Sequence, residues 1–129
     1  MNQERSERID QLQARKEGQA GEPGGETMQV PVNVYEAGEA LVVVAPLPGV
    51  QPEDVDVSVE GARLRIAAAM RSPAPKDYIV HEWHYGPYER IIDLPDGFSG
   101  GGTATFGNGQ LAIRLTRGTG GGPIQVKSA

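Results

Sequence analysis

The sequence predicts an all-β protein, an antiparallel β-sandwich of seven to eight short strands. Apolar residues alternate with polar ones along several runs, which is typical of strands with one buried face. Most of these runs are bounded by Gly, Pro or Asn, the residues that favour turns. In addition, 18 glycines and 10 prolines among 129 residues disfavour long helices.

The runs themselves locate the expected strands. Residues 41–45 are continuously apolar, which predicts a strand covered on both faces. Residues 78–84 form a further expected strand, bounded by prolines before it and by Gly86 and Pro87 after it. The runs that alternate with a period of two, and so predict one buried and one wet face, are residues 30–35, 55–60, 63–68 and 111–116.

Turn residues separate the strands. Gly38 suits a short hairpin turn, and Gly61 suits a tight reversal. Pro46 and Pro48 end a strand, because proline cannot donate a hydrogen bond to a ladder. Asn108-Gly109 is the strongest hairpin signal, since both residues tolerate a positive φ.

The domain organisation follows from the glycine clusters at residues 18–25, 100–102 and 118–122, which we interpret as flexible connectors. They divide the chain into a polar arm (1–27), a β body (28–117) and a glycine-hinged tail (118–129). In the arm only Ile9 and Leu12 could form an apolar helical stripe. The arm is therefore either flexible or a weak helix that becomes ordered on a partner.

Composition excludes several classes of protein. The net charge of −5 disfavours a nucleic-acid binder. The lack of cysteine excludes disulfides, a thiolate nucleophile and a Cys-ligated zinc site. No apolar run is long enough for a membrane span or placed as in a signal peptide. We therefore expect a cytoplasmic protein with one folded domain.

The usual signatures of catalysis are not found in the sequence. His81 and His84 are three residues apart, whereas a zinc-protease helix needs a spacing of four, so we interpret them as ordinary strand residues. The glycine clusters lack the Lys and Ser/Thr of a phosphate loop, and no serine lies in a nucleophile elbow. We therefore predict no enzyme activity, no metal site and no cofactor.

Six segments, in order along the body and tail, resemble the small heat-shock proteins of the α-crystallin type. The likeness covers about 95 residues and does not include the arm. Each segment is weakly specific alone, but their shared order is specific. The segments are Pro31 to Glu36, Leu41 to Ala45 with Leu47-Pro48-Gly49-Val50, Pro52 to Val59, Gly86-Pro87-Tyr88-Glu89-Arg90 with Leu94-Pro95, Ala104 to Leu111 with Asn108-Gly109, and Ile124-Gln125-Val126.

The resemblance implies an immunoglobulin-like sandwich, the α-crystallin domain, and an ATP-independent holdase that keeps partly unfolded proteins from aggregating. Its partners would be unfolding client proteins, further copies of itself in a dimer and higher oligomer, and ATP-dependent chaperones downstream. The alternative is a co-chaperone or adaptor like the CS domain, acting through one defined protein contact. A third class, an enzyme or carbohydrate-binding sandwich, has no site in the sequence.

The resemblance also implies a role for the tail motif, Ile124 and Val126. These residues lie two apart, so in an extended tail both point the same way and form a removable apolar plug. The hinge favours a tail that reaches another chain, and a chain ending at Arg117 is then expected to form smaller assemblies. The alternative is a last strand of the same sheet.

Two further sets of residues follow from the resemblance. One set would line the groove for the tail or a client, although core packing is an equal alternative: Val55, Val57, Val59, Ala104, Phe106 and Leu111. The other set would exchange strands across a dimer, with an intrachain strand, and a plain surface role for the arginine, as alternatives: Tyr78, Ile79, Val80, Trp83 and Arg90 against Val32 and Val34 of the opening strand.

Overall fold

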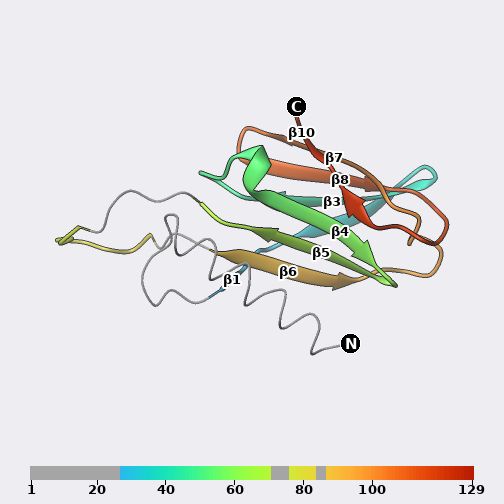
Figure 1. The fold of residues 1–129 in the computed structure, drawn as a ribbon, viewed down its shortest axis with the longest axis horizontal. Helices are drawn as coiled ribbons and strands as arrows, with labels where there is room; N and C mark the ends of the chain where they lie inside the picture. The colour runs from blue at the N-terminus through green and yellow to red at the C-terminus, as the bar shows by residue number, and fades with distance from the viewer. Residues whose placement is uncertain (1–26, 71–75, 84–86) are drawn as a thin grey trace.

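The structure is a computed structural model that describes residues 27–70, 76–83 and 87–129. The expected arm, apart from its last residue, and the linker 71–75 lie outside the described residues. The described part forms two sheets of five strands each, packed face to face (Figure 1). The prediction of an all-β sandwich is therefore confirmed.

The first sheet has the order β1-β6-β5-β4-β9 and the second has the order β10-β7-β8-β3-β2. All pairings are antiparallel except two parallel ones, β1 with β6 and β10 with β7. The described part has more strands than predicted because two- and three-residue strands form near its ends. The bounds are β1 Met28–Gln29, β2 Asn33–Ala37, β3 Ala40–Pro46, β4 Val55–Glu60, β5 Arg63–Ala68, β6 Tyr88–Asp93, β7 Gly102–Gly107, β8 Gln110–Leu115, β9 Pro123–Ile124 and β10 Val126–Ser128, with a 3-10 turn at Pro52–Asp54.

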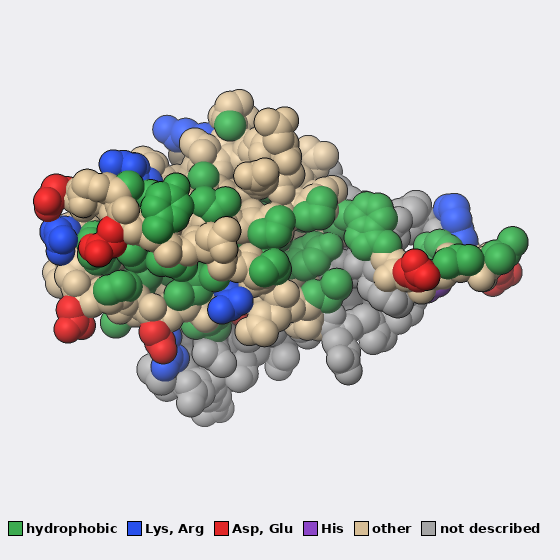
Figure 2. All heavy atoms as spheres, turned by 180° about the vertical axis from the view of Figure 1, so that it is seen from behind, with side chains coloured by type: hydrophobic (Ala, Val, Ile, Leu, Met, Phe, Trp, Pro, Cys, Tyr) green, Lys and Arg blue, Asp and Glu red, His purple; other side chains and the backbone are tan. Residues whose placement is uncertain are grey.

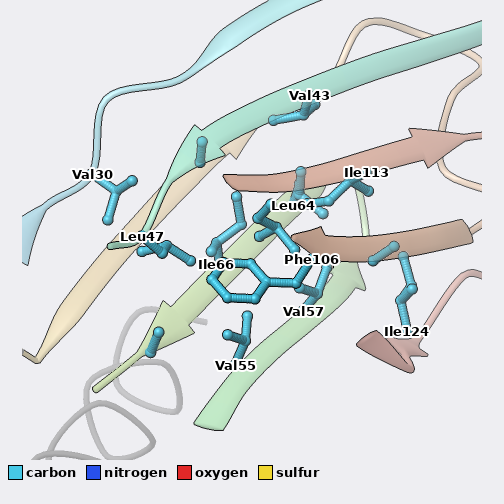
Figure 3. Close-up of a cluster of buried hydrophobic side chains, with 14 of the residues drawn as sticks. Val30, Val43, Leu47, Val55, Val57, Leu64, Ile66, Phe106, Ile113 and Ile124 are labelled. Carbon is cyan, nitrogen blue, oxygen red and sulfur yellow. The ribbon is translucent and has the colours of Figure 1, made fainter. Parts of the chain in front are cut away.

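The core lies between the two sheets, where the alternating residues meet (Figure 3). Leu64 and Ile66 of β5 pack there with Ile113 of β8, and all three are essentially inaccessible to solvent. Burying such a side chain contributes about 1.5–3 kcal/mol to stability. The hydrophobic alternation in the sequence is thus the direct cause of the sandwich.

The turns also follow the sequence. Gly38 has a φ of +62° between β2 and β3, and Gly61 has a φ of +64° between β4 and β5. Asn108 and Gly109 both have positive φ, 52° and 75°, so the two-residue turn between β7 and β8 twists in the sense that a hairpin needs. These hairpins set the register of both sheets.

The expected strand over residues 30–35 is wrong in its first half, because the strand found there, β2, begins only at Asn33. β1 ends at Gln29 and belongs to the first sheet, whereas β2 begins at Asn33 and belongs to the second. The chain crosses between the sheets at Val30, which is buried, and Pro31, which has no N–H to donate. The crossing leaves β2 as the last strand of its sheet.

The expected wet face of β5 is also wrong. Arg65 and Ala67 are buried, although they lie on the opposite face from Leu64 and Ile66. Nε of Arg65 donates to Oε2 of Glu89 on β6 at 3.3 Å, so the buried guanidinium is paired with a carboxylate. This ion pair joins two neighbouring strands of the first sheet.

The expected strand over residues 78–84 is absent from its described part. Residues 76–83 form no ladder and project beyond the two sheets (Figure 1). No described strand pairs with this segment. Across the described ranges, no helix is long and apolar enough to cross a membrane.

Candidate functional site

Strand β2 is an open edge of the second sheet. One side pairs with β3 and no strand of the described chain pairs with the other. Val34 lies opposite Val43, which is fully buried, yet Val34 is 42% exposed. An open edge with exposed apolar side chains is a template for pairing with another strand.

A shallow hollow lies beside this edge, on the outer face of the second sheet. Its volume is about 350 Å³, and Val32 and Val44 are half-buried in its lining. Figure 2 shows hydrophobic side chains gathered on this side of the molecule. The hollow is lined by Pro31, Val32, Asn33, Val44, Pro46 and Gln110.

The projecting segment carries a second set of uncovered apolar side chains. Ile79 is fully exposed, Val80 is 69% exposed and Trp83 is 55% exposed. The rings of Tyr78 and His81 stack with their centroids 4.2 Å apart. Because such side chains are normally buried, this segment is typical of a chain that packs against a partner.

Arg90 lies on β6, in the first sheet. Its Nη1 donates to the backbone oxygen of Val30 at 3.0 Å. It therefore ties β6 to the crossing segment that leads into β2. Arg90 was expected either at a dimer contact or at a plain surface position. The structure shows a hydrogen bond within the chain, to the segment that leads into the predicted dimer edge.

The tail lies along one side of the sandwich, where it pairs with β4 of the first sheet and with β7 of the second. Ile124 on β9 pairs with Val57 of β4, and Val126 on β10 pairs with Ala104 of β7. Ile124 is only 8% exposed and belongs to the hydrophobic core cluster (Figure 3). The two halves of the tail motif thus pair with different sheets and close this side.

All six predicted groove residues are core residues in this structure. Val57 and Ala104 lie directly beside the tail, whereas Leu111 is completely inaccessible. The tail of the same chain pairs with the two strands that carry Val57 and Ala104. The six are Val55, Val57, Val59, Ala104, Phe106 and Leu111.

The tail therefore differs from the leading expectation, since it lies on its own chain. The reason is geometric. The residues before it, 118–122, hydrogen-bond to the loop before β7 and leave no slack for a longer reach. A segment tethered this closely has an effective concentration in the millimolar range or above at its own groove, which favours docking within the chain.

Residues 100–102 and 118–122, which we interpreted as flexible connectors, are in contact in the structure. These two clusters lie against each other, backbone to backbone. The signal was present in the sequence. A hairpin centred on Asn108-Gly109 places Gly102 opposite Leu115, and the residues before and after them then meet as well.

The candidate site therefore consists of the β2 edge, the projecting segment and the tail. Among residues 27–70, 76–83 and 87–129, no group of three or more Asp, Glu or His side chains could hold a metal ion. His84, which the sequence pairs with His81, lies outside the described residues.

Comparisons with known proteins assign this arrangement to a family. Residues 33–127 match the model of the Hsp20/alpha crystallin family. The chain belongs to that family. The match covers more than half of the chain and includes the open edge, the projecting segment and the tail motif.

Individual members of the Hsp20/alpha crystallin family are more distant. The spore protein SP21 of Stigmatella aurantiaca is 28% identical over 88 residues, which are 65% of this chain and 52% of that protein. The chain thus spans about half the length of this curated relative.

Solved small heat-shock proteins share the sandwich. HspA from Xanthomonas axonopodis is 28% identical with a TM-score of 0.64, covering 71% of this chain and 96% of that one. A small heat-shock protein from Xylella fastidiosa, described as having a distinct high order structure, is 26% identical with a TM-score of 0.61, covering 70% and 87%. Heat shock protein 16.0 from Schizosaccharomyces pombe, 24% identical with a TM-score of 0.63 and coverage of 75% and 72%, shows the fold alone.

Proposed function

We propose that this small heat-shock protein is an ATP-independent holdase. It binds partly unfolded proteins, keeps them from aggregating, and leaves their refolding to ATP-dependent chaperones. The observation that carries the proposal is the uncovered apolar surface on a well-packed sandwich, at the open edge of β2 and along residues 78–83. Unfolding proteins expose surfaces of the same kind, and apolar contact needs no nucleotide.

The same two surfaces also support a homodimer, so they are open to a client only in chains that have separated. The projecting segment of one chain adds a strand to the β2 edge of its partner, and the exchange is reciprocal. Both chains thereby cover Ile79 and Val80, and both lose an exposed edge. The hollow beside Val32 would take an apolar side chain from the partner's segment.

Light scattering tests the holdase activity. A heat-labile client is warmed without ATP, alone, with an equimolar amount of this protein, or with an inert protein of similar size. We expect scattering to be suppressed only by this protein. No suppression by a folded dimer would overturn the proposal. A monomer that does not suppress scattering would instead favour the adaptor function.

A further inference from the structure

The outer faces of the two sheets differ in how far solvent reaches them. β8 is the central strand of the second sheet, and its outward residues Ala112 and Arg114 are exposed. β5 is the central strand of the first sheet, yet its outward residues Ala67 and Arg65 are only 0% and 5% exposed. The residue types are the same on both strands, so side-chain size does not explain the difference. The outer face of the first sheet is therefore covered.

No described strand or helix supplies this cover. All the described strands belong to the two sheets, and the described 3-10 turn leads directly into β4. The segment 76–83 projects beyond the sheets (Figure 1). Ala67 also lies outside the hydrophobic core cluster, which contains its neighbours Ile66 and Ala68. The burial of Ala67 thus comes from its outer side and not from the core.

The covered face is apolar at its centre and negatively charged around it. Ala67 lies opposite Asp56 of β4 on one side and opposite Glu89 of β6 on the other. Ile91 is half-buried on the same face, beside a hollow of about 330 Å³. The charged residues whose side chains alternate onto this face are Asp56, Glu60, Glu89 and Asp93 against Arg63 and Arg65. A segment with apolar side chains flanked by basic ones is complementary to this face.

The arm contains such a segment in residues 2–17. On a helix with about 100° per residue, Ile9 and Leu12 fall within a stripe about 120° wide, which we name the arm stripe. All the basic residues of this segment fall within the arm stripe, and all its acidic residues fall outside it. The basic residues are Arg5, Arg8, Arg15 and Lys16, and the acidic residues are Glu4, Glu7, Asp10 and Glu17. The arm stripe is therefore apolar and positive, the complement of the covered face.

The arm joins the body at the edge of this face. β1 pairs with β6, the neighbour of β5, and the amide of Met28 donates to the carbonyl of Pro87 at 2.8 Å. Adjacent strands lie about 4.8 Å apart, whereas residues 18–26 span up to about 30 Å when extended. Residues 2–17 can therefore reach the whole face. A tether of this length also keeps them at a high effective concentration there.

We propose that residues 2–17 dock as a helix on the outer face of the first sheet of their own chain. The arm stripe lies over Ala67 and Ile91, and its basic residues lie beside the carboxylates of the face. A helix of this length is marginal in water, so the sheet provides the contacts that order it. The proposal is independent of the holdase function, because it concerns a face that neither the β2 edge nor the projecting segment uses.

Thiol labelling of the full chain measures the cover. The chain has no cysteine, so one introduced thiol reports on one position. Ala67→Cys probes the covered face, and Ala112→Cys is the matched control on the exposed face of β8. We expect a soluble thiol reagent to modify Ala67→Cys at least about tenfold more slowly than Ala112→Cys. Equal rates would overturn the proposal.

Two substitutions in the arm then identify what covers the face. Leu12→Asp places a carboxylate within the arm stripe, whereas Ala14→Asp adds the same charge on the opposite side of the helix. Neither changes the sequence of the sandwich. In the Ala67→Cys chain we expect Leu12→Asp to speed labelling at least about fivefold, and Ala14→Asp to change it less than about twofold. Equal effects of the two, or no effect of Leu12→Asp, would exclude the arm as the cover.

Hydrogen exchange of the natural full chain keeps the test valid if Ala67→Cys disturbs the face. We expect the amides of residues 5–17 to exchange at least about tenfold more slowly than in Leu12→Asp, because an undocked helix of this length gives little protection. Unprotected amides in the natural chain would overturn the docking. Protection that stays constant on hundredfold dilution supports docking within one chain. Protection lost on dilution would assign the face to the arm of a second copy and overturn the proposal as stated.

Discussion

At the scale of single residues, two ion pairs between β5 and β6 differ in burial. Nε of Arg65 lies 3.3 Å from Oε2 of Glu89, and the two side chains are 6% and 14% exposed. Nε of Arg63 lies 3.0 Å from Oδ1 of Asp93, and those side chains are 37% and 87% exposed. Breaking a buried pair leaves an uncompensated charge, whereas water replaces a lost partner at the surface.

We therefore predict that Arg65→Ala lowers the free energy of unfolding by about 3 kcal/mol, because it removes a buried ion pair with the carboxylate of Glu89. The matched change Arg63→Ala lowers it by less than about 1 kcal/mol. Urea denaturation of both variants measures the difference. Equal losses would contradict the burial assigned to Arg65.

A second prediction at this scale concerns the tail motif. Ile124→Ala removes a side chain that is 8% exposed and packs in the core, so we expect a loss of about 2 kcal/mol in the free energy of unfolding. Gln125→Ala, at the exposed residue between the two strands of the tail, is the control and should change stability by less than about 0.5 kcal/mol. Urea denaturation at low protein concentration measures both. No effect of Ile124→Ala would show that the tail does not dock on its own chain.

At the scale of elements, the β2 edge and the segment 76–83 are complementary. The outer edge of β2 has no strand partner among the described residues, and the segment 76–83 has apolar side chains that are exposed to solvent. Neither can satisfy the other within a single chain, because the segment projects away from the sheets (Figure 1). Their completion by a second chain is the element-level basis of the proposed dimer.

We predict that Val34→Lys and Ile79→Lys each convert the dimer into a monomer, because each buries a charge in the exchanged strand pair. Thr103→Lys, on the exposed side of β7, should leave the dimer intact. Sedimentation measures the mass of each variant. Trp83 is the single tryptophan, so its emission should shift to the blue as the natural chain is concentrated and associates. Dimers of unchanged affinity in both Lys variants would exclude this exchange.

At the scale of the whole molecule, the tail closes one side of the sandwich instead of extending from it. β9 pairs with the first sheet and β10 pairs with the second, so the same short segment covers the edges of both layers. The expectation that tails link many chains follows from a flexible hinge. In the structure the hinge residues contact the loop before β7, and we propose the β2 edge as the link between chains.

We predict that a chain ending at Arg117 keeps the dimer mass of the full chain, because the tail contributes no contact to the proposed interface. Light scattering combined with size-exclusion chromatography measures both masses. The truncated chain should be less stable, since the edges of β4 and β7 lose their cover. A fall to a smaller species on truncation would show that the tail joins chains after all.

The sequence alone was enough to predict most strands and turns of the body. Leu111, Ile113 and Leu115 alternate with exposed neighbours as predicted, and Asn108-Gly109 forms the predicted hairpin. These features are local, because side-chain alternation and a positive φ depend on residues close together in the chain. The family resemblance also depended on such local segments and their order.

Which apolar surfaces are exposed to solvent depends on the tertiary structure and could not be predicted from the sequence. Val57 and Phe106 are apolar residues of an alternating strand whether the tail beside them comes from their own chain or from another. Residues 78–83 have the pattern of a strand, but a strand needs a partner edge, and no strand among the described residues pairs with them. The two glycine clusters have the composition of linkers, yet the register of the β7–β8 hairpin brings them into contact. Pairing between distant segments depends on the whole arrangement of the chain, which local patterns do not encode.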